Sequence, residues 1–205
     1  MGYEQRELEA AWEALSHVSR LLEPLSPNWL VGGSCGLLLQ GVPIGRPPRD
    51  IDIYVDEIHT AAAAFCLKEF ATDQLQYNET DIYSSHLSHY ELSGISVELV
   101  GGFVVRSMNS RYEVNVSARL SPVSEEAVIK QVKFHLMPLP HEFVFNVLRE
   151  RMDRVQAIAS RMGAEPDKYR PVLSSIIKEN TISDEAKQVM KLALGDAGGA
   201  WAACW

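Results

Sequence analysis

Residues 29–56 read WLVGGSCGLLLQGVPIGRPPRDIDIYVD. A short apolar run ends in a Gly-Gly-Ser turn at positions 32–34, and further along Asp50 and Asp52 alternate with isoleucine and valine. Residues two apart on a strand point to the same face, so the pattern predicts a strand whose two carboxylates stand side by side. Like charges held together cost free energy unless a cation shares the site, and paired carboxylates hold Mg²⁺ against substrate phosphates. The stretch therefore predicts a metal-dependent site that handles phosphate.

The turn and a later acid supply the other parts of this site. Glycine at position 33 lets the backbone approach a phosphate closely, and the free N–H groups of the helix that opens at Ser34 attract anions. Glu98 lies on the polar face of a second predicted strand, residues 95–105. If the strands that carry Asp52 and Glu98 are neighbours in a sheet, three carboxylates converge on one or two cations.

This arrangement predicts phosphoryl or nucleotidyl transfer. Metal ions between Asp50 and Asp52 would neutralise a triphosphate and stabilise the leaving pyrophosphate. Glu98 would hold the metal on the acceptor side or accept the proton of an attacking hydroxyl. Ser34 and the neighbouring N–H groups would bind the distal phosphates.

The segment resembles the nucleotidyltransferase superfamily, which includes DNA polymerase beta, the CCA-adding enzymes and the antibiotic nucleotidyltransferases. The signature of that superfamily is an apolar residue, Gly-Gly or Gly-Ser, a spacer, and Asp-x-Asp on a strand, with a third acid later. The corresponding residues here are Val31-Gly32-Gly33-Ser34, Asp50-Ile51-Asp52 and Val97-Glu98-Leu99. The stretch GRPPRDID at 45–52 is also similar to the corresponding stretch of CCA-adding enzymes.

The resemblance implies a fold, a cofactor and a set of roles. It implies a mixed sheet flanked by helices, and an enzyme that uses a nucleoside triphosphate such as ATP together with Mg²⁺ or Mn²⁺. The implied roles are catalysis and metal binding for Asp50, Asp52 and Glu98, and nucleotide binding for Gly33, Ser34 and Arg49. For Arg46 and Arg49, an ordinary solvated loop position is the alternative.

The acceptor stays open. The spacer between Ser34 and Asp50 is longer than the family pattern, and Cys35-Gly36 replaces the Arg-Asp pair that follows the glycines in CCA-adding enzymes. The acceptor is a hydroxyl of a small molecule, a protein or a tRNA end. A non-catalytic module that binds nucleotide or a partner on the same fold is the alternative function, and the intact set of three acids favours catalysis over it.

A second stretch, from Met137 to Ala159, resembles the segment after the sheet in aminoglycoside- and lincosamide-type members. There a basic and an acidic residue on a helix lie near the substrate, and Arg151, Asp153 and Arg154 occupy such positions here. A solvated helix face is the alternative for these residues.

Hydrophobic periodicity outlines the other elements. Helices are predicted over 4–23, 35–40, 56–70, 167–179 and 184–194, and strands over 29–31, 50–55, 82–92, 95–105 and 111–116. Residues 127–137 are ambiguous between a strand and a short helix. A helical stripe runs from Leu148 to Met162 and ends at Gly163.

Interleaved strands and helices followed by helices alone predict an α/β (α+β) fold, a mixed sheet flanked by helices with a C-terminal helical subdomain. A boundary near Pro138 would divide the chain into a head, residues 1–137, and a helical part, residues 138–205. The tail GDAGGAWAACW is expected to be loose, with Trp201 and Trp205 disordered or docked on a partner.

Composition limits the remaining possibilities. The chain has 205 residues, of which 46% are hydrophobic, and a net charge of −8. That charge argues against broad nucleic-acid binding. No apolar run approaches the roughly 18 residues that span a bilayer, so we expect a cytoplasmic protein without membrane contact. Three widely spaced cysteines argue against a disulfide framework or a zinc ribbon.

Two further features have ordinary explanations. His86 and His89 lie on a predicted strand, where their spacing places them on opposite faces, so structural or surface roles are expected rather than metal binding. Cys35 follows the turn without an evident histidine partner, and is expected to be a small packed residue rather than a nucleophile.

Overall fold

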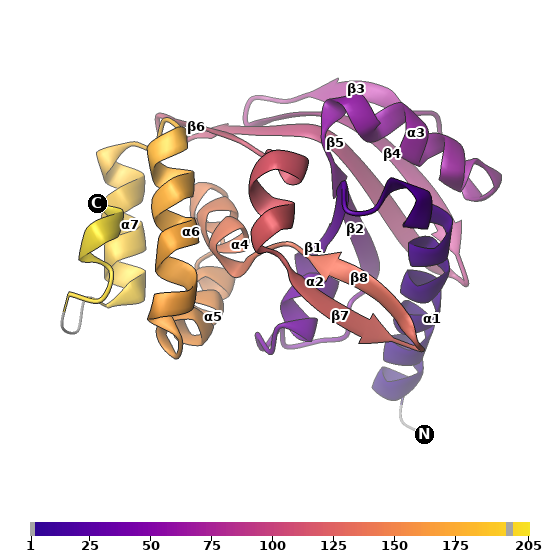
Figure 1. Ribbon diagram of the computed structural model, residues 1–205, viewed down its shortest axis with the longest axis horizontal. Coiled ribbons are helices and arrows are strands. Elements are labelled where there is room, and N and C mark those ends of the chain that lie inside the picture. The colour runs from indigo at the N-terminus through magenta and orange to yellow at the C-terminus, as the bar shows by residue number, and fades with distance from the viewer. Residues whose placement is uncertain (1–2, 196–198) are drawn as a thin grey trace.

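The chain folds around a mixed β-sheet. The computed structural model describes residues 3–195 and 199–205. Within these residues the sheet has eight strands, in the order β3-β4-β5-β2-β1-β8-β7, and β6 also pairs with β5 (Figure 1). The strands are β1 (Trp29–Gly32), β2 (Asp50–Val55), β3 (Gln76–Glu79), β4 (Tyr83–Leu92), β5 (Ile95–Ser107), β6 (Ser110–Glu113), β7 (Glu125–Ile129) and β8 (Val132–Leu136).

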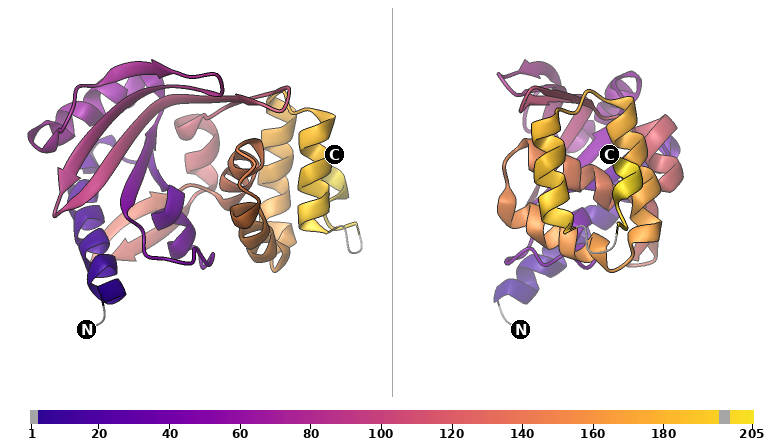
Figure 2. Two further views of the ribbon diagram at one scale, coloured as in Figure 1. Left: turned by 180° about the vertical axis from the view of Figure 1, so that it is seen from behind. Right: turned by 90° about the vertical axis from the view of Figure 1, so that its left-hand side faces the viewer.

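Helices cover the sheet and extend the molecule at one end. The first and third helices pack on the sheet, and the last four follow one another at the other end of the molecule (Figures 1 and 2). The helices are α1 (Tyr3–Leu22), α2 (Gly33–Leu39), α3 (Glu57–Leu67), α4 (Leu139–Leu148), α5 (Met152–Gly163), α6 (Pro166–Glu179) and α7 (Asp184–Leu194). The predicted fold class, a mixed sheet flanked by helices with further helices at the C-terminal end, is confirmed.

The pairing of β2 with its neighbours decides where the predicted acids lie. β2 runs parallel to β5 and antiparallel to β1, and Asp52 is the register partner of Glu98. Ile51 and Ile53 are fully buried on the other face of β2. Because side chains alternate along a strand, burial of the isoleucines directs Asp50 and Asp52 to the opposite face.

Two hydrophobic cores hold the layers together. One lies between the sheet and the helices α1 and α3, and includes Leu15 and Ile53. The other joins the sheet to the C-terminal helices, and includes Tyr54 and Phe143. A large apolar side chain that is fully buried contributes about 1.5–3 kcal/mol to folding, so both contacts are strong. The face of the sheet that carries the acids is therefore bordered by helices from the end of the chain.

The ambiguous stretch 127–137 belongs to a β-hairpin. β7 and β8 pair in antiparallel fashion, and the turn residues Lys130 and Gln131 have φ values of 48° and 65°. Two-residue hairpin turns with positive φ usually carry glycine, asparagine or aspartate. Because this turn has none of these residues, the sequence pattern contains no turn signal. The two strands therefore look like one continuous segment in the sequence.

The predicted helical stripe from Leu148 to Met162 is split between two helices. α4 ends at Leu148 and α5 begins at Met152, with Glu150 at a φ of 55° between them. All ten residues of α4 are buried. A helix that is buried on every side has no polar face, so its sequence lacks the amphipathic period that would identify it.

The prediction of a loose tail is wrong for its final residues. Residues 196–198 of that tail lie outside the described part of the chain. Trp201 and Cys204 are 3% and 1% exposed, and the segment packs on α6. Arg170 of α6 donates to the carbonyl of Ala200, 3.0 Å from Nη1. Burial of a large indole ring provides the free energy that orders this segment.

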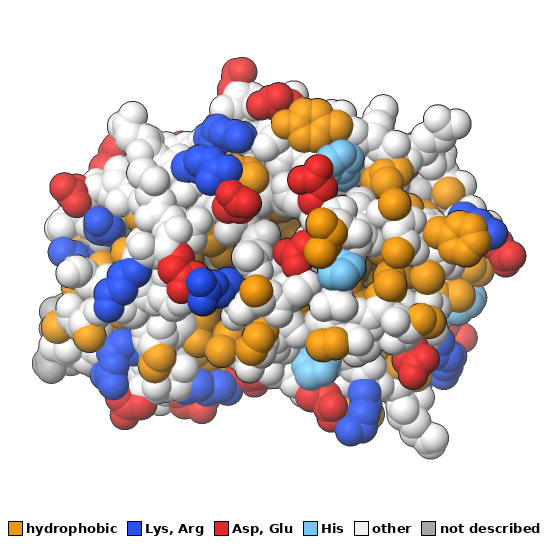
Figure 3. Space-filling view, turned by 45° about the horizontal axis from the view of Figure 1, so that its top comes forward, with side chains coloured by type: hydrophobic (Ala, Val, Ile, Leu, Met, Phe, Trp, Pro, Cys, Tyr) orange, Lys and Arg blue, Asp and Glu red, His pale blue; other side chains and the backbone are white. Residues whose placement is uncertain are grey.

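The outer surface carries charges of both signs. Figure 3 shows acidic and basic side chains interspersed over the helical end of one face, and more hydrophobic side chains over the end that carries α3. In α3, Ile58 and Phe65 are 82% and 66% exposed. No helix in residues 3–195 or 199–205 has the length and apolarity needed to cross a membrane. The division at Pro138, which falls between β8 and α4, stays a prediction.

Candidate active site

A cavity of about 550 Å³ lies where the sheet meets α4 and α5. Its walls come from the turn after β1, the loop before β2, the strands β2 to β5 and the two helices. The residues predicted for the site all line it: Gly33, Ser34, Arg49, Asp50, Asp52 and Glu98. The fold thus brings the three segments of the predicted site into one cavity.

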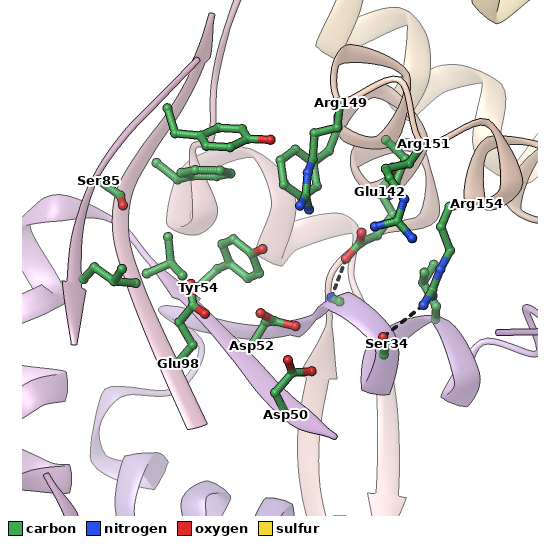
Figure 4. A pocket seen from close by; sticks show the side chains of 18 of the residues that line it. Ser34, Asp50, Asp52, Tyr54, Ser85, Glu98, Glu142, Arg149, Arg151 and Arg154 are labelled. Atoms are coloured by element: carbon green, nitrogen blue, oxygen red, sulfur yellow. Dashed lines mark hydrogen bonds between the residues drawn. The ribbon is translucent and has the colours of Figure 1, made fainter. Parts of the chain in front are cut away.

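The carboxyl groups of the three acids share this cavity. Figure 4 shows Asp50 and Asp52 side by side on β2, with Glu98 on the neighbouring strand. Burial raises the pKa of Asp52 to about 8, and the charges of Asp50 and Glu98 act in the same direction. Burial also raises the pKa of Glu98 above its usual range. Near neutral pH the cavity therefore holds carboxyl groups that are costly to ionise together.

The donor set suits a divalent cation. Of the neighbouring charges that act most strongly on Asp52, three are acids and one, Arg149, is basic. A cation among these oxygens would relieve the repulsion, and carboxylates are the ligands that Mg²⁺ prefers. Across residues 3–195 and 199–205, however, no group of three or more His, Cys, Asp or Glu side chains stands ready to coordinate a metal. The residue types fit the ion, and metal binding stays a proposal.

The glycine turn packs directly against Asp52. Gly33 has a φ of +57°, and a Cβ at this position would lie 1.7 Å from Asp52 Oδ2. A Cβ on Gly32 would lie 2.9 Å from Glu142 Oε1. Glycine at these two positions therefore allows the backbone to pass between the carboxyl groups of Asp52 and Glu142. The turn and the acids form a single packed unit.

Glu142 is a cavity residue that the sequence interpretation missed. It lies on α4, is 2% exposed, and accepts a hydrogen bond from the Gly33 N–H at 2.8 Å. Burial raises its pKa to about 7, against the lowering effects of the Gly33 hydrogen bond and of Arg154. The signal was present, because Glu142 is the one acid in the apolar run from Leu139 to Phe145. Acids in such runs are seldom buried without a partner.

Arginine side chains line the cavity beside the acids. Arg154 of α5 donates to Ser34 Oγ, with Nη2 at 3.2 Å, and thereby joins the helical end to the glycine turn. The other arginines of the lining are Arg46, Arg49, Arg149 and Arg151. Of the residues suggested by the second resemblance, Arg151 and Arg154 line the cavity. Asp153 does not, and pairs with Arg151 at the surface.

The histidines and the cysteine considered above lie outside this lining. His89 pairs with Asp73, and His86 packs edge-on against Tyr77. Cys35 is buried in the core under α1 and α3, and burial raises the pKa of its thiol. A protonated thiol is a poor nucleophile.

The fold is similar to those of two solved structures, one of which is assigned to the class of nucleotidyltransferases. A protein from Thermotoga maritima assigned to that class has a TM-score of 0.58 and 22% identity, over 74% of this chain and 91% of its own. The antibiotic-resistance factor ANT(2'')-Ia has a TM-score of 0.53 and 8% identity, over 84% of this chain and 94% of its own.

The family follows from the sequence match. The family model of the aminoglycoside-2''-adenylyltransferases matches residues 14–129, which is more than half of the chain. The chain belongs to this family, and it is a nucleotidyltransferase. No curated protein sequence gives a significant match.

Proposed function

We propose that the protein transfers AMP from ATP to a hydroxyl group of a small molecule, in a reaction that depends on a divalent cation. The observation that carries the proposal is the convergence of Asp50, Asp52 and Glu98 in one cavity beside the Gly33 turn. The family to which the chain belongs supports the adenylyl group and the small acceptor. The cavity, at about 550 Å³, is in the usual range for small-molecule sites.

The transfer forms one bond and breaks another. The acceptor oxygen forms a bond to the α-phosphorus of ATP, the bond from that phosphorus to the bridging oxygen breaks, and pyrophosphate leaves with the electron pair. The proton of the acceptor hydroxyl passes to the Glu98 carboxylate, whose raised pKa makes it a better base than a solvated glutamate. The products are the adenylylated acceptor, pyrophosphate and a proton.

The residues around the acids would bind the leaving group. Ser34 and the arginines Arg49 and Arg154 would hold the distal phosphates at the end of the cavity formed by the glycine turn. Asp50 and Asp52 would hold Mg²⁺ or Mn²⁺, which would neutralise the charge of the triphosphate and of pyrophosphate, and Glu98 would remain free to accept the proton. The chain's part is to position the reacting groups and to keep water away from them.

Pyrophosphate release tests the proposal. We expect release from ATP with Mg²⁺ and a hydroxyl acceptor, and weaker release from GTP, CTP or UTP. Absence of release with every nucleotide and acceptor, together with absence of Mg²⁺-dependent ATP binding, would overturn it. A protein or tRNA acceptor would appear instead as label from [α-³²P]ATP on that macromolecule.

Variants separate catalysis from simple binding. Asp50→Ala should keep its fold, lose the Mg²⁺-dependent rise in melting temperature and lose turnover by at least about 100-fold. Glu91→Gln is the matched control, because Glu91 is an exposed acid on β4 outside the cavity. Equal Mg²⁺ affinity in wild type and Asp50→Ala would remove Asp50 from the site. A biological effect that survives in the inactive variant would favour a binding module.

A further inference from the structure

One side of the cavity is built from aromatic rings. Tyr83 of β4, Phe103 of β5 and Phe145 of α4 contact one another, and we call these three residues the aromatic wall. The ring centroids are 5.7 Å apart for Tyr83 and Phe103, and 5.3 Å apart for Phe103 and Phe145. Phe103 and Phe145 are buried, whereas Tyr83 is partly exposed and gives the wall a surface toward the cavity.

The aromatic wall and the glycine turn lie on opposite sides of the acids. In the sheet, β2 lies between β1, which leads into the turn, and β5, which is followed by β4. Figure 4 shows Ser85 and Tyr54 on one side of Asp52, and Ser34 and Arg154 on the other. Glu98 stands on the side of the wall, because it belongs to β5.

The side of the cavity that carries the aromatic wall has a basic and an acidic side chain, Arg149 and Glu98. The Arg149 guanidinium lies 4.8 Å from the ring centroid of Phe145 and 5.7 Å from that of Tyr83. Besides Tyr83, three neutral polar residues line the cavity on β3, on β4 and in the turn between these strands: Asn78, Thr80 and Ser85. Among the described lining residues of β3, β4 and β5, Glu98 is the one acid, and the proposed reaction already uses it.

The reaction geometry assigns this side to the acceptor. In phosphoryl transfer the attacking and leaving oxygens lie roughly in line through the phosphorus. If pyrophosphate leaves toward Ser34 and Arg154, the acceptor must approach from the opposite side, past Glu98. This step rests on the proposed function, because it takes the position of the phosphates from it.

The geometry points to an acceptor that is an uncharged hydroxyl compound carrying a flat apolar ring, and not a polycationic amino sugar. The ring would lie against Tyr83 and under the Arg149 guanidinium, while Asn78, Thr80 and Ser85 offer neutral hydrogen-bonding groups. On this side of the cavity several ammonium groups would lie beside the Arg149 guanidinium, with Glu98 as the one carboxylate among the described lining residues of β3, β4 and β5, and like charges at close range are unfavourable. Aromatic surfaces in contact provide affinity without any charge on the ligand.

Three probes test this inference by titration calorimetry. Phenyl β-D-glucoside carries hydroxyls and an apolar ring, methyl β-D-glucoside lacks the ring, and kanamycin A is a polycation. Each is titrated into the full-length protein, with and without Mg²⁺ and α,β-methylene-ATP. We expect phenyl glucoside to bind about tenfold more tightly than methyl glucoside, and kanamycin to bind more weakly than either. Tighter binding of kanamycin, or equal binding or no binding of the two glucosides, would overturn the inference.

Variants locate the ring of the probe. Tyr83→Ala should lower the affinity for phenyl glucoside about tenfold and leave that for methyl glucoside and for the nucleotide analogue unchanged. Tyr83→Phe keeps the ring and should retain the preference. Tyr77→Ala is the matched control, because Tyr77 is exposed on β3 and lies outside the cavity lining. A loss of nucleotide affinity in Tyr83→Ala would assign the wall to the base of ATP, and would overturn the inference.

Failure of the proposed function gives a different result. If the wild-type protein does not bind α,β-methylene-ATP, the adenylyl-transfer proposal fails. The comparison of the two glucosides without nucleotide still measures whether the wall binds an apolar ring.

Discussion

At the scale of single residues, the contact between Gly33 and Asp52 fixes the turn against β2. The φ of Gly33 is +57°, and a Cβ there would lie 1.7 Å from the Asp52 carboxylate. We expect Gly33→Ala to lower the free energy of unfolding by more than about 2 kcal/mol, because it adds a clash to backbone strain. Urea unfolding followed by circular dichroism measures this change, and pyrophosphate release should be lost with it.

Gly94→Ala separates the effect of the clash with Asp52 from the effect of backbone strain at positive φ. Gly94 has a φ of +75°, and a Cβ on it would meet nothing within 4 Å. This variant should lose about 1 kcal/mol from the backbone conformation alone and keep its activity. Equal losses in both variants would show that the contact with Asp52 is unimportant.

Glu142 makes stability depend on pH. Its pKa in the folded protein is raised by burial to about 7 from the ordinary value of 4.5. Between these values the folded state keeps a proton that the unfolded state releases, so the contribution of Glu142 to stability falls as the pH rises. Glu142→Gln does not titrate and keeps an acceptor for the Gly33 N–H. Its free energy of unfolding relative to wild type should therefore rise by about 1–3 kcal/mol between pH 4.5 and pH 8.

Unfolding curves at several pH values measure this difference. Glu91→Gln provides the baseline, because Glu91 is exposed on β4. A difference between Glu142→Gln and wild type that stays constant across the range would show that Glu142 ionises normally in the folded protein.

At the scale of elements, the break between α4 and α5 aims two arginines into the cavity. Arg149 and Arg151 flank Glu150, whose φ of 55° places it in the left-handed region. We expect Glu150→Gly to raise the free energy of unfolding by about 0.5–1 kcal/mol, because glycine adopts this conformation without strain. Thermal melts measure this change. In the same measurement Glu150→Ala should leave the free energy of unfolding unchanged. A loss of stability in Glu150→Gly would mean that the Glu150 side chain makes a contact more valuable than the strain it carries.

The same elements show what the sequence could and could not predict. The alternation of Asp50, Ile51 and Asp52 predicts both the strand and the face to which the two carboxylates point. This part of the site therefore follows from the local sequence pattern. Glu142 lies on α4, which is buried on all sides, and Arg149 directly follows that helix, so their positions in the cavity depend on long-range packing. The β7–β8 turn has positive φ without glycine or asparagine. Tertiary contacts decide such segments, and local sequence patterns do not contain those contacts.

At the scale of the whole molecule, one hydrophobic core joins the sheet to the C-terminal helices. It contains Leu30 and Val100 from strands, together with Phe143, Leu173 and Trp201 from the end of the chain. Because neither the sheet nor the C-terminal helices can bury these residues without the other, we expect one cooperative unfolding transition. In hydrogen exchange at increasing urea, peptides from β2 and β5 should lose protection together with peptides from α6. Earlier loss in α6 would show that the helical part unfolds independently.

The hydrogen bonds that Gly33 N–H donates to Glu142 and that Arg154 donates to Ser34 bear on how members of the family differ from one another. The matched region ends at residue 129, before either partner on the helices. Members of the family can therefore share the acids on β2 and β5 and the glycine turn, while they differ in the α4 and α5 side chains that contact this turn. Replacement of the C-terminal helices would remove the side chains that contact the glycine turn, so similarity over the matched region alone does not fix which compound a member of the family modifies.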